Sequence, residues 1–241
     1  MAKHLSKSQI DRLGDRLRQQ EYGEAELRLL DEYRLTFGSA YDLVIERIQR
    51  LAGLPVSGRP AKSTTSIIQK LNRESIRLSQ MQDIAGCRTV VDNLLDQDRI
   101  AQEIASAFED VTVLDRRVKP SHGYRAVHLV VREYNKTIEV QIRTALQHVW
   151  AEMCEKLADM DPAIKYGGGP EDARKALEHA SRVIDTVEST EAVLGRAGEG
   201  TGPEAEIMRA VAKEVRVLRN EYLNNLQSVI NKLMDREEVP D

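Results

Sequence analysis

The stretch KTIEVQIRT alternates between polar and branched apolar positions, which predicts a strand over residues 137–143 with one apolar face. The other face carries an acid, an amide and a guanidinium, from Glu139, Gln141 and Arg143. Such a row is costly to bury without partners, so we expect it to border a wet cleft and to contact something polar. A second predicted strand just upstream turns its branched residues to the core and presents His128 on the opposite side. The pattern therefore predicts that the chemistry is concentrated on one surface of two adjacent strands.

The rest of the chain shows both helical and strand periodicities. Helices are predicted over residues 5–20, 25–52, 63–77, 94–108, 145–157, 171–193 and 204–236. Strands are predicted over 84–91, 111–118, 126–132 and 137–143, with loops over 57–60 and 195–203. This order is typical of an α/β core in which helices flank a small mixed sheet. We expect an N-terminal helix in residues 1–24, a core domain in 25–168 and a helical C-terminal extension in 169–241.

The predicted third helix is basic along one face. Its positions on that face are Lys62, Ser66, Lys70, Arg73 and Arg77. Arg59 precedes the helix in a Gly-Pro loop, and a helix N-terminus attracts phosphate. Two interpretations are equally favoured by these residues: a solvated basic face and a helix that binds polyphosphate.

Asp83 lies where a helical segment turns into a predicted strand. Aspartate is common at such turns because it bonds its own backbone. Together with Glu139 on a neighbouring strand, it could hold Mg²⁺ through two carboxylates and leave positions for water and phosphate oxygens.

Two further groups have both a structural and a functional interpretation. Tyr124 follows Gly123 in a loop and is either an aromatic at a strand edge or a platform on which a base stacks. His148 and Glu152 are spaced i, i+4 on the helix after the polar strand. They are either a surface pair or a support that orients the site.

Length and composition narrow the function classes. A chain of 241 residues can hold one good core with an appendage or two small domains. The net charge of −4 gives no whole-chain signal for binding nucleic acid or an anionic membrane. Cys87 and Cys154 are the only cysteines and no CxxC is present, which argues against zinc and against a disulfide scaffold and fits a cytoplasmic protein. Neither a secretory signal nor an apolar run of membrane-spanning length is found, so no membrane role is expected.

The last predicted helix has an apolar stripe with spacings of three and four. Its members are Ile207, Val211, Val215, Leu218, Tyr222, Leu226, Val229 and Leu233. Packing on the chain's own core and a homo-oligomer seam are equally favoured. Docking of a partner protein or nucleic acid is a third use.

Taken together, these segments resemble the synthetase domain of the RelA/SpoT family of alarmone synthetases. The matching pieces are Arg59, Lys62, Ser66 and Lys70, then DIAGCR at 83–88, GYRAVH at 123–128, EVQIRT at 139–144, and finally His148 with Ala151-Glu152. The resemblance covers about residues 25–168 and implies a nucleotidyltransferase-like fold. The EVQIRT segment and its GYxxxH partner are its most specific parts.

The resemblance implies an ATP-dependent pyrophosphate transfer with Mg²⁺ as cofactor. The ribose 3′-hydroxyl of GDP or GTP would attack the β-phosphorus of ATP, giving AMP and (p)ppGpp. It implies that ATP is bound by Arg59, Lys62, Ser66, Lys70 and Arg88, and Mg²⁺ by Asp83 and Glu139. The residues implied to bind the acceptor are Lys119, His122, Tyr124, His128, Gln141 and Arg143. The catalytic group would consist of Glu139, Gln141, Lys70 and Asp83.

The chain departs from the family pattern close to the implied acceptor site. It has Lys119-Pro120 where the family usually has Pro-Lys, and Arg125-Ala126-Val127 where Gln-Ser-Leu is usual. Arg59 and Lys62 are also one residue further apart than usual. Two of these three changes fall where the phosphates of the acceptor are implied to bind. They keep two other acceptors open: the 3′-terminal adenosine of tRNA, as in toxic family members that an antitoxin neutralises, and an adenosine nucleotide. A catalytically silent nucleotide-binding oligomer is an alternative of another class.

No hydrolase activity is expected. The hydrolase domain of long family members needs a histidine-rich metal site, and only His4 precedes His122 in this chain.

Overall fold

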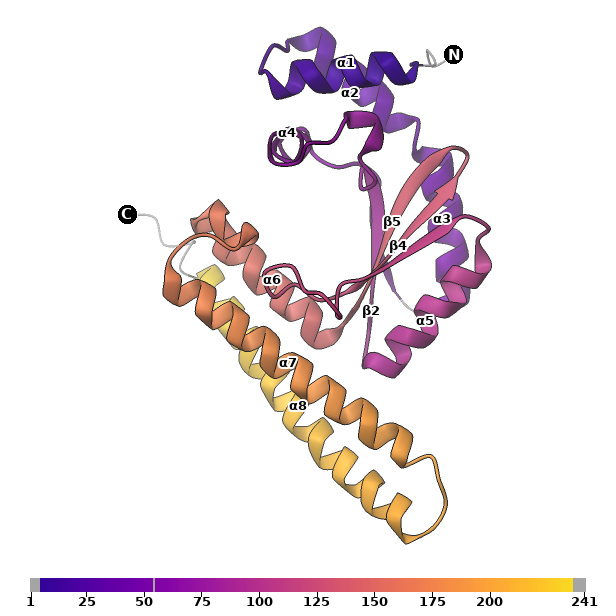
Figure 1. Ribbon diagram of the computed structural model, residues 1–241, viewed down its shortest axis with the longest axis vertical. Coiled ribbons are helices and arrows are strands. Elements are labelled where there is room, and N and C mark those ends of the chain that lie inside the picture. Colours follow the sequence, from indigo (N-terminus) through magenta and orange to yellow (C-terminus); the bar gives the residue numbers. More distant parts are fainter. Residues whose placement is uncertain (1–4, 54, 236–241) are drawn as a thin grey trace. The chain divides into compact units, whose positions relative to one another are not determined.

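The computed structural model describes residues 5–53 and 55–235 (Figure 1). Its α-helices are α1 (Lys7–Arg18), α2 (Glu24–Leu35), α3 (Gly38–Ala52), α4 (Thr64–Arg73), α5 (Leu94–Ala107), α6 (Ala145–Met160), α7 (Glu171–Ala197) and α8 (Pro203–Asp235). Its strands are β1 (Val56–Arg59), β2 (Ala85–Val91), β3 (Val111–Asp115), β4 (Val127–Glu133) and β5 (Lys136–Thr144). Short 3₁₀ turns cover Leu78–Gln80 and Pro162–Tyr166. Within the described residues, no helix is both long and apolar enough to cross a membrane.

The five strands form one sheet with the order β1-β2-β5-β4-β3. β1 runs antiparallel to β2, with Val56 opposite Thr89. β4 and β5 are joined by Tyr134 and Asn135, whose φ angles of 48° and 58° are those of a two-residue hairpin turn that matches the twist of the flanking strands. The mixed sheet and the flanking helices confirm the α/β fold predicted from the sequence.

Three local predictions were wrong in their boundaries. The helix predicted over 25–52 is two helices, because the chain turns at Thr36, whose hydroxyl donates to the carbonyl of Tyr33 at 2.6 Å. The loop predicted over 57–60 begins within β1, which forms because β2 supplies partners that no local pattern reveals.

The basic helix is also shorter than predicted. α4 begins after Ser63, whose hydroxyl accepts a hydrogen bond from the Ser66 amide at 3.2 Å, and it ends where Glu74 takes an extended conformation. Lys62 precedes the helix and Arg77 follows it, so the prediction that all five positions share a helical face was wrong.

Contacts group the chain into two compact units. The first holds the described residues up to Thr89 together with 103–114 and 128–141, and the second holds 90–102, 115–127 and the residues from Ile142 onward. In the first unit α1 packs on α2, on α4 and on the turn at Leu78–Gln80, as Figure 1 shows. The domain boundaries predicted at 24/25 and 168/169 stay predictions.

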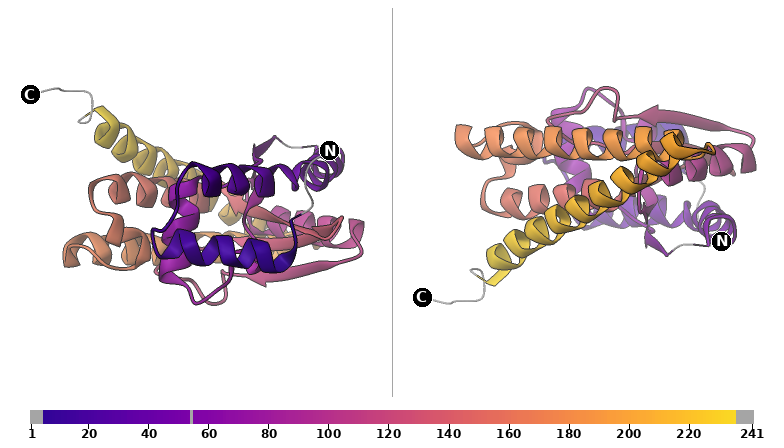
Figure 2. Two further views of the ribbon diagram at one scale, coloured as in Figure 1. Left: turned by 90° about the horizontal axis from the view of Figure 1, so that it is seen from above. Right: turned by 90° about the horizontal axis from the view of Figure 1, so that it is seen from below.

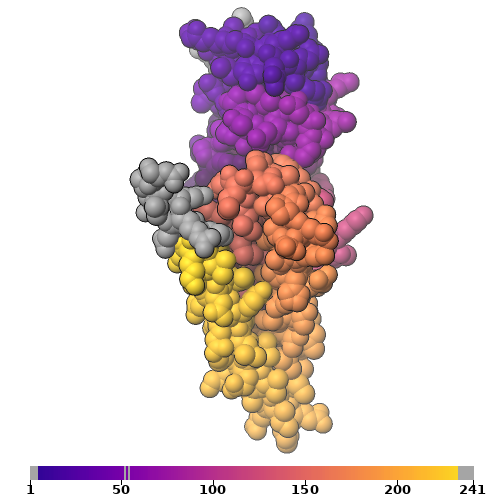
Figure 3. All heavy atoms as spheres, turned by 90° about the vertical axis from the view of Figure 1, so that its left-hand side faces the viewer, coloured from indigo at the N-terminus to yellow at the C-terminus, as the bar shows by residue number. Residues whose placement is uncertain are grey.

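Helices α6, α7 and α8 form the core of the second unit. α7 and α8 lie side by side (Figure 3), and α8 diverges from α7 as it runs along α6 (Figure 2). Their shared apolar cluster includes Trp150, Leu177, Ile184, Leu226 and Ile230.

The predicted apolar stripe of the last helix is only partly buried. Leu226 is buried and Val215 and Tyr222 are half-buried, but Ile207, Val211, Leu218 and Val229 are exposed. The side chain of Leu233 lies outside the described residues. The buried line of α8 begins instead with Ala205 and Ala212, because small side chains allow α7 and α8 to approach closely. A homo-oligomer through the exposed part of the stripe stays a prediction.

Candidate functional site

Glu139 lies at the centre of a polar cluster in the first unit. The β4–β5 hairpin places His128 beside it, with His128 Nδ1 and Glu139 Oε1 3.0 Å apart. Gln141 Nε2 donates to the other carboxylate oxygen at 2.8 Å. Ile138 and Val140 are fully buried between these polar positions, which confirms the alternation predicted for the strand.

The surroundings of Glu139 keep its carboxylate charged. Burial raises the pKa of Glu139. The hydrogen bond and charge of His128 lower it, as does the hydrogen bond from Gln141. Together these two residues outweigh burial, so the pKa lies below the usual value. The negative charge of Asp83 raises the pKa in return, by less than these bonds lower it. Glu139 is therefore ionised at neutral pH and can accept a proton.

Asp83 is bound by two lysines. Lys62 Nζ lies 2.7 Å from Oδ2 and Lys70 Nζ lies 3.0 Å from Oδ1. The Asp83 and Lys62 side chains are each 12 % exposed and that of Lys70 is 21 % exposed. Burial raises the pKa of Asp83, but the two ammonium groups outweigh it and the pKa falls below its usual value. Burial also lowers the pKa of Lys62.

The other residues predicted to bind ATP are Arg59, Ser66 and Arg88. Arg59 donates to the Asp83 carbonyl at 3.2 Å. Ser66 is half-buried and its hydroxyl accepts a hydrogen bond from Ser63 at 2.8 Å, so it contributes to the cap of α4. Arg88 is half-buried on β2. The structure therefore gathers three cationic side chains at Asp83: Arg59 binds its backbone carbonyl and the two lysines described above bind its carboxylate.

Gly86 lets β2 approach the strand that carries Glu139. A Cβ at this position would lie 2.7 Å from the Glu139 carbonyl oxygen, so a side chain would force the strands apart. Within the described residues no group of three or more histidine, cysteine or acidic side chains could hold a metal. Mg²⁺, however, needs only one or two carboxylates when phosphates and water complete its shell. The pair Asp83 and Glu139 fits that ligand set, since each carboxylate oxygen can accept further bonds.

Tyr124 and Arg143 form a pair in the second unit. The Arg143 guanidinium donates to the Tyr124 hydroxyl at 3.2 Å from Nε and at 3.1 Å from NH2. Its central carbon lies 5.1 Å from the centre of the tyrosine ring. Arg143 therefore fixes the orientation of the ring.

The remaining predicted residues are placed less tightly. Lys119 and His122 are exposed, and His122 has a φ of 52°. Lys119 forms no hydrogen bond or ion pair with the described part of the chain. His148 and Glu152 form the predicted pair, with Nε2 and Oε1 3.3 Å apart.

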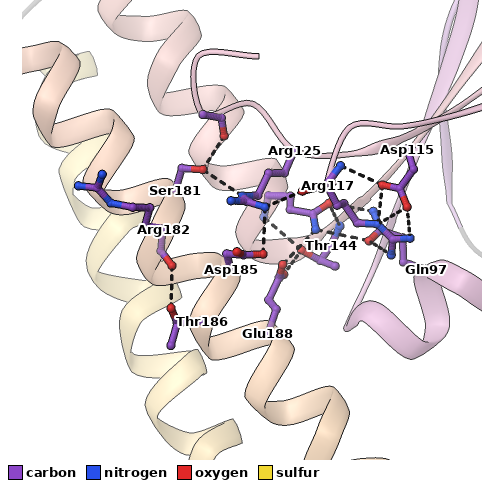
Figure 4. Close-up of polar contacts among 12 residues, drawn as sticks. Gln97, Asp115, Arg117, Arg125, Thr144, Ser181, Arg182, Asp185, Thr186 and Glu188 are labelled. Carbon is purple, nitrogen blue, oxygen red and sulfur yellow. Dashed lines mark hydrogen bonds and ion pairs between the residues drawn. The ribbon is translucent and has the colours of Figure 1, made fainter. Parts of the chain in front are cut away.

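Sequence reasoning missed a buried polar network in the second unit. Glu188 of α7 accepts hydrogen bonds from the hydroxyl of Thr144 and, at 3.0 Å, from Gln147 Nε2. Gln97 Nε2 in turn donates to Gln147 Oε1 at 2.8 Å, and Arg117 donates to Gln97 Oε1 at 3.2 Å. Figure 4 shows most of this network converging on the start of α6. The one feature of the sequence that could have indicated this network is Glu188, a glutamate on the apolar face of the helix predicted over 171–193.

The network borders a cavity of about 320 Å³. Its lining includes Arg117, Arg125, Asp185 and Glu188. None of the site residues predicted from the sequence lines it, among the residues that the structure describes. The cavity therefore belongs to the network that supports α6 and α7.

Glu188 should make folding stability depend on pH. Burial raises its pKa to about 7, although Thr144 and Gln147 bond it. In the unfolded chain the pKa of Glu188 is near 4.5. Between that pH and pH 7 the native state keeps a proton on Glu188 that the unfolded state has lost, so the free energy of unfolding should fall as pH rises through this window. The loss should be on the order of 3 kcal/mol, from about 1.4 kcal/mol for each pKa unit.

Urea unfolding at pH 5 and at pH 8 measures this effect. Glu188→Gln should remove most of the difference in unfolding free energy between the two pH values, whereas Glu178→Gln on the exposed side of α7 should leave it. An unchanged pH slope in Glu188→Gln would contradict the assignment.

Known proteins match the segment that carries this geometry. The family described as the region found in RelA / SpoT proteins matches residues 58–158. An uncharacterised protein of Mycobacterium tuberculosis (strain ATCC 25618 / H37Rv) is 41 % identical over 142 residues, which cover 54 % of this chain and 52 % of that protein. The chain spans about half the length of the curated relatives it matches.

Two further likenesses are more distant. A probable chloroplastic GTP diphosphokinase of Arabidopsis thaliana is 34 % identical over 96 residues, which cover 38 % of this chain and 13 % of that protein. The crystal structure of small alarmone synthetase 1 from Bacillus subtilis is 27 % identical, with a TM-score of 0.51 over 74 % of this chain and 100 % of that chain. Residues 58–158 of this chain belong to a RelA/SpoT-family synthetase domain.

Proposed function

We propose that this chain transfers pyrophosphate from ATP to the ribose 3′-hydroxyl of GDP or GTP, producing AMP and (p)ppGpp. Family membership supports pyrophosphate transfer in general, and the name of the plant relative supports a guanosine acceptor. The observation that carries the proposal is that one unit holds both the Glu139 carboxylate, bonded by His128 and Gln141, and two lysines that bind the carboxylate of Asp83.

The residues of the first unit would act on the phosphates and on the hydroxyl. Lys62 and Lys70 would bind the negative oxygens of ATP, which compete with Asp83 for the ammonium groups. Glu139, which its bonds to His128 and Gln141 hold in place, would accept the proton of the 3′-hydroxyl. The ribose oxygen then forms a bond to the β-phosphorus, the bond from that phosphorus to the α–β bridging oxygen breaks, and AMP leaves.

Positioning and charge, rather than a covalent nucleophile, would supply most of the acceleration. Mg²⁺ held by Asp83 and Glu139 would neutralise charge on the phosphate oxygens. In the second unit, Tyr124 held by Arg143 would stack on the acceptor base.

Incubation with ATP labelled in its β- and γ-phosphates, together with Mg²⁺, tests the proposal. Parallel reactions contain GDP, GTP, no other nucleotide, or bulk tRNA. Label transferred to a guanosine nucleotide would support the proposal. Label transferred to tRNA alone would replace it with a translation-blocking toxin, for which an antitoxin partner would be sought, and label on a second ATP would indicate an adenosine alarmone. No transfer in any reaction would refute it.

Tyr124 should control acceptor affinity alone. Tyr124→Ala removes the stacking platform, worth about 1–3 kcal/mol for each base, so the KM for the acceptor should rise about 5- to 150-fold. Tyr124→Phe keeps the ring but loses the hydroxyl that Arg143 binds, so a smaller rise is expected. The measurement is initial rate against acceptor concentration at saturating ATP. An equal rise in the KM for ATP would contradict the assignment.

A further inference from the structure

Three polar side chains of α7 contact the two segments that carry Tyr124 and Arg143. They are Ser181, Asp185 and Glu188, at i, i+4 and i+7 on one face of the helix. Figure 4 shows this face turned toward Arg125 and Thr144, within the second unit. Arg125 follows Tyr124 directly and Thr144 follows Arg143 directly, so the contacts hold the immediate neighbours of both residues.

The loop at Tyr124 is bound on both of its sides. Before the tyrosine, the Ser181 hydroxyl donates to the Gly123 carbonyl at 2.6 Å. After it, Arg125 donates to the Ser181 hydroxyl at 3.2 Å and to Asp185 Oδ1 at 2.9 Å. Arg125 also donates to the Arg117 carbonyl at 2.8 Å, which closes the loop on itself.

Packing reinforces these bonds. Gly123 has a φ of 88°, and a Cβ there would lie 2.8 Å from the Trp150 ring and 3.2 Å from the Ser181 Cβ. The Trp150 indole donates to the Leu177 carbonyl of α7 at 2.9 Å. The backbone before Tyr124 is thus held between α6 and α7.

The second segment is held in the same way. Thr144 caps α6 by accepting a hydrogen bond from the Gln147 amide at 3.2 Å, and its hydroxyl donates to Glu188. This cap fixes the backbone next to Arg143, whose guanidinium orients the Tyr124 ring. One helix face therefore constrains the tyrosine through its own loop and through its arginine partner.

We propose that Ser181 and Asp185 are positioning residues for the acceptor, which act through Arg125 and Gly123 by holding Tyr124 in its binding orientation. The inference rests on the proposed function, since it takes Tyr124 as the platform for the acceptor base. It also gives Arg125, one of the departures from the family pattern, a role in anchoring α7 rather than in touching the acceptor. A preorganised ring loses less freedom when the base binds, so losing the anchors weakens acceptor binding.

The test compares Ser181→Ala and Asp185→Asn with two controls on the same helix. Thr186→Ala removes a hydroxyl that donates to the Arg182 carbonyl of its own helix, at 3.0 Å, and Glu178→Gln changes an exposed acid. For each variant the KM and kcat are measured for acceptor and for ATP. The acceptor Kd is measured by calorimetry without ATP.

Each anchor variant should raise the acceptor KM and Kd about tenfold, as expected for loss of a hydrogen bond to a charged or buried group, with kcat and the KM for ATP within about twofold of wild type. The controls should match wild type. Because Asp185 acts through Arg125, Asp185→Asn should add nothing further in an Arg125→Gln background.

Unchanged acceptor binding in the anchor variants, with a wild type that transfers pyrophosphate, would overturn this inference alone. A parallel loss of acceptor and ATP affinity would also overturn it, because general support of the fold would not separate the two substrates. A wild type that transfers to no acceptor would instead refute the proposed function.

Discussion

Glu139→Gln is expected to reduce pyrophosphate transfer by at least about 10³-fold, within the range that a general base contributes. The amide cannot accept the proton of the ribose hydroxyl and is a poor ligand for Mg²⁺. The bonds from His128 and Gln141 hold this carboxylate in place. The measurement is the rate of label transfer at saturating nucleotide.

Glu133→Gln is the matched control, since it makes the same change at the turn end of the same hairpin and should keep wild-type activity. Both variants should unfold within about 1–2 kcal/mol of wild type, because the amide can still take part in one hydrogen bond. Wild-type activity should stay constant above about pH 5 and fall as pH drops through the lowered pKa of Glu139. Residual activity of a tenth or more in Glu139→Gln would remove Glu139 from its proposed role.

The site residues that a local pattern could predict are those on the strands. The alternation around Glu139 predicts which side chains share a face. A two-residue hairpin turn then brings His128 to that face. These relations depend on periodicity and short turns, which a sequence displays directly.

Other parts of the site depend on contacts between distant segments. The two lysines were predicted to bind phosphate, but not to bind Asp83, because the reach of Lys62 from outside α4 depends on how the chain returns after Glu74. The role of α7 was missed for the same reason. Ser181 and Asp185 are ordinary polar residues of an amphipathic helix until Arg125 is placed beside them.

Asp83→Asn should show the second large effect, a loss of about 3 kcal/mol in unfolding free energy together with the loss of activity. Removing one partner of a buried ion pair costs about 3–5 kcal/mol, and the lower end applies because the side chains keep some exposure. Lys62 would lose its ion pair, while Lys70 beside it would keep the longer one with Glu74, at 3.9 Å. Urea unfolding at pH 7 measures the loss. Asp110→Asn is the control, since the Asp110 and Arg132 side chains of its ion pair are 61 % and 53 % exposed and the pair should contribute less than about 1 kcal/mol.

Two conditions separate this charge effect from a packing effect. Because the pKa of Asp83 is lowered in the folded state, its contribution is complete above the unfolded value near 4 and is lost as pH falls through the folded value, so wild type and Asp83→Asn should converge in stability at low pH. Inorganic tripolyphosphate without metal should stabilise Asp83→Asn more than wild type, because it supplies the missing negative charge to the two lysines. Equal stabilisation of both proteins would mean that the lysines do not form a polyphosphate site, and the proposed ATP-binding role of this cluster would fail with it.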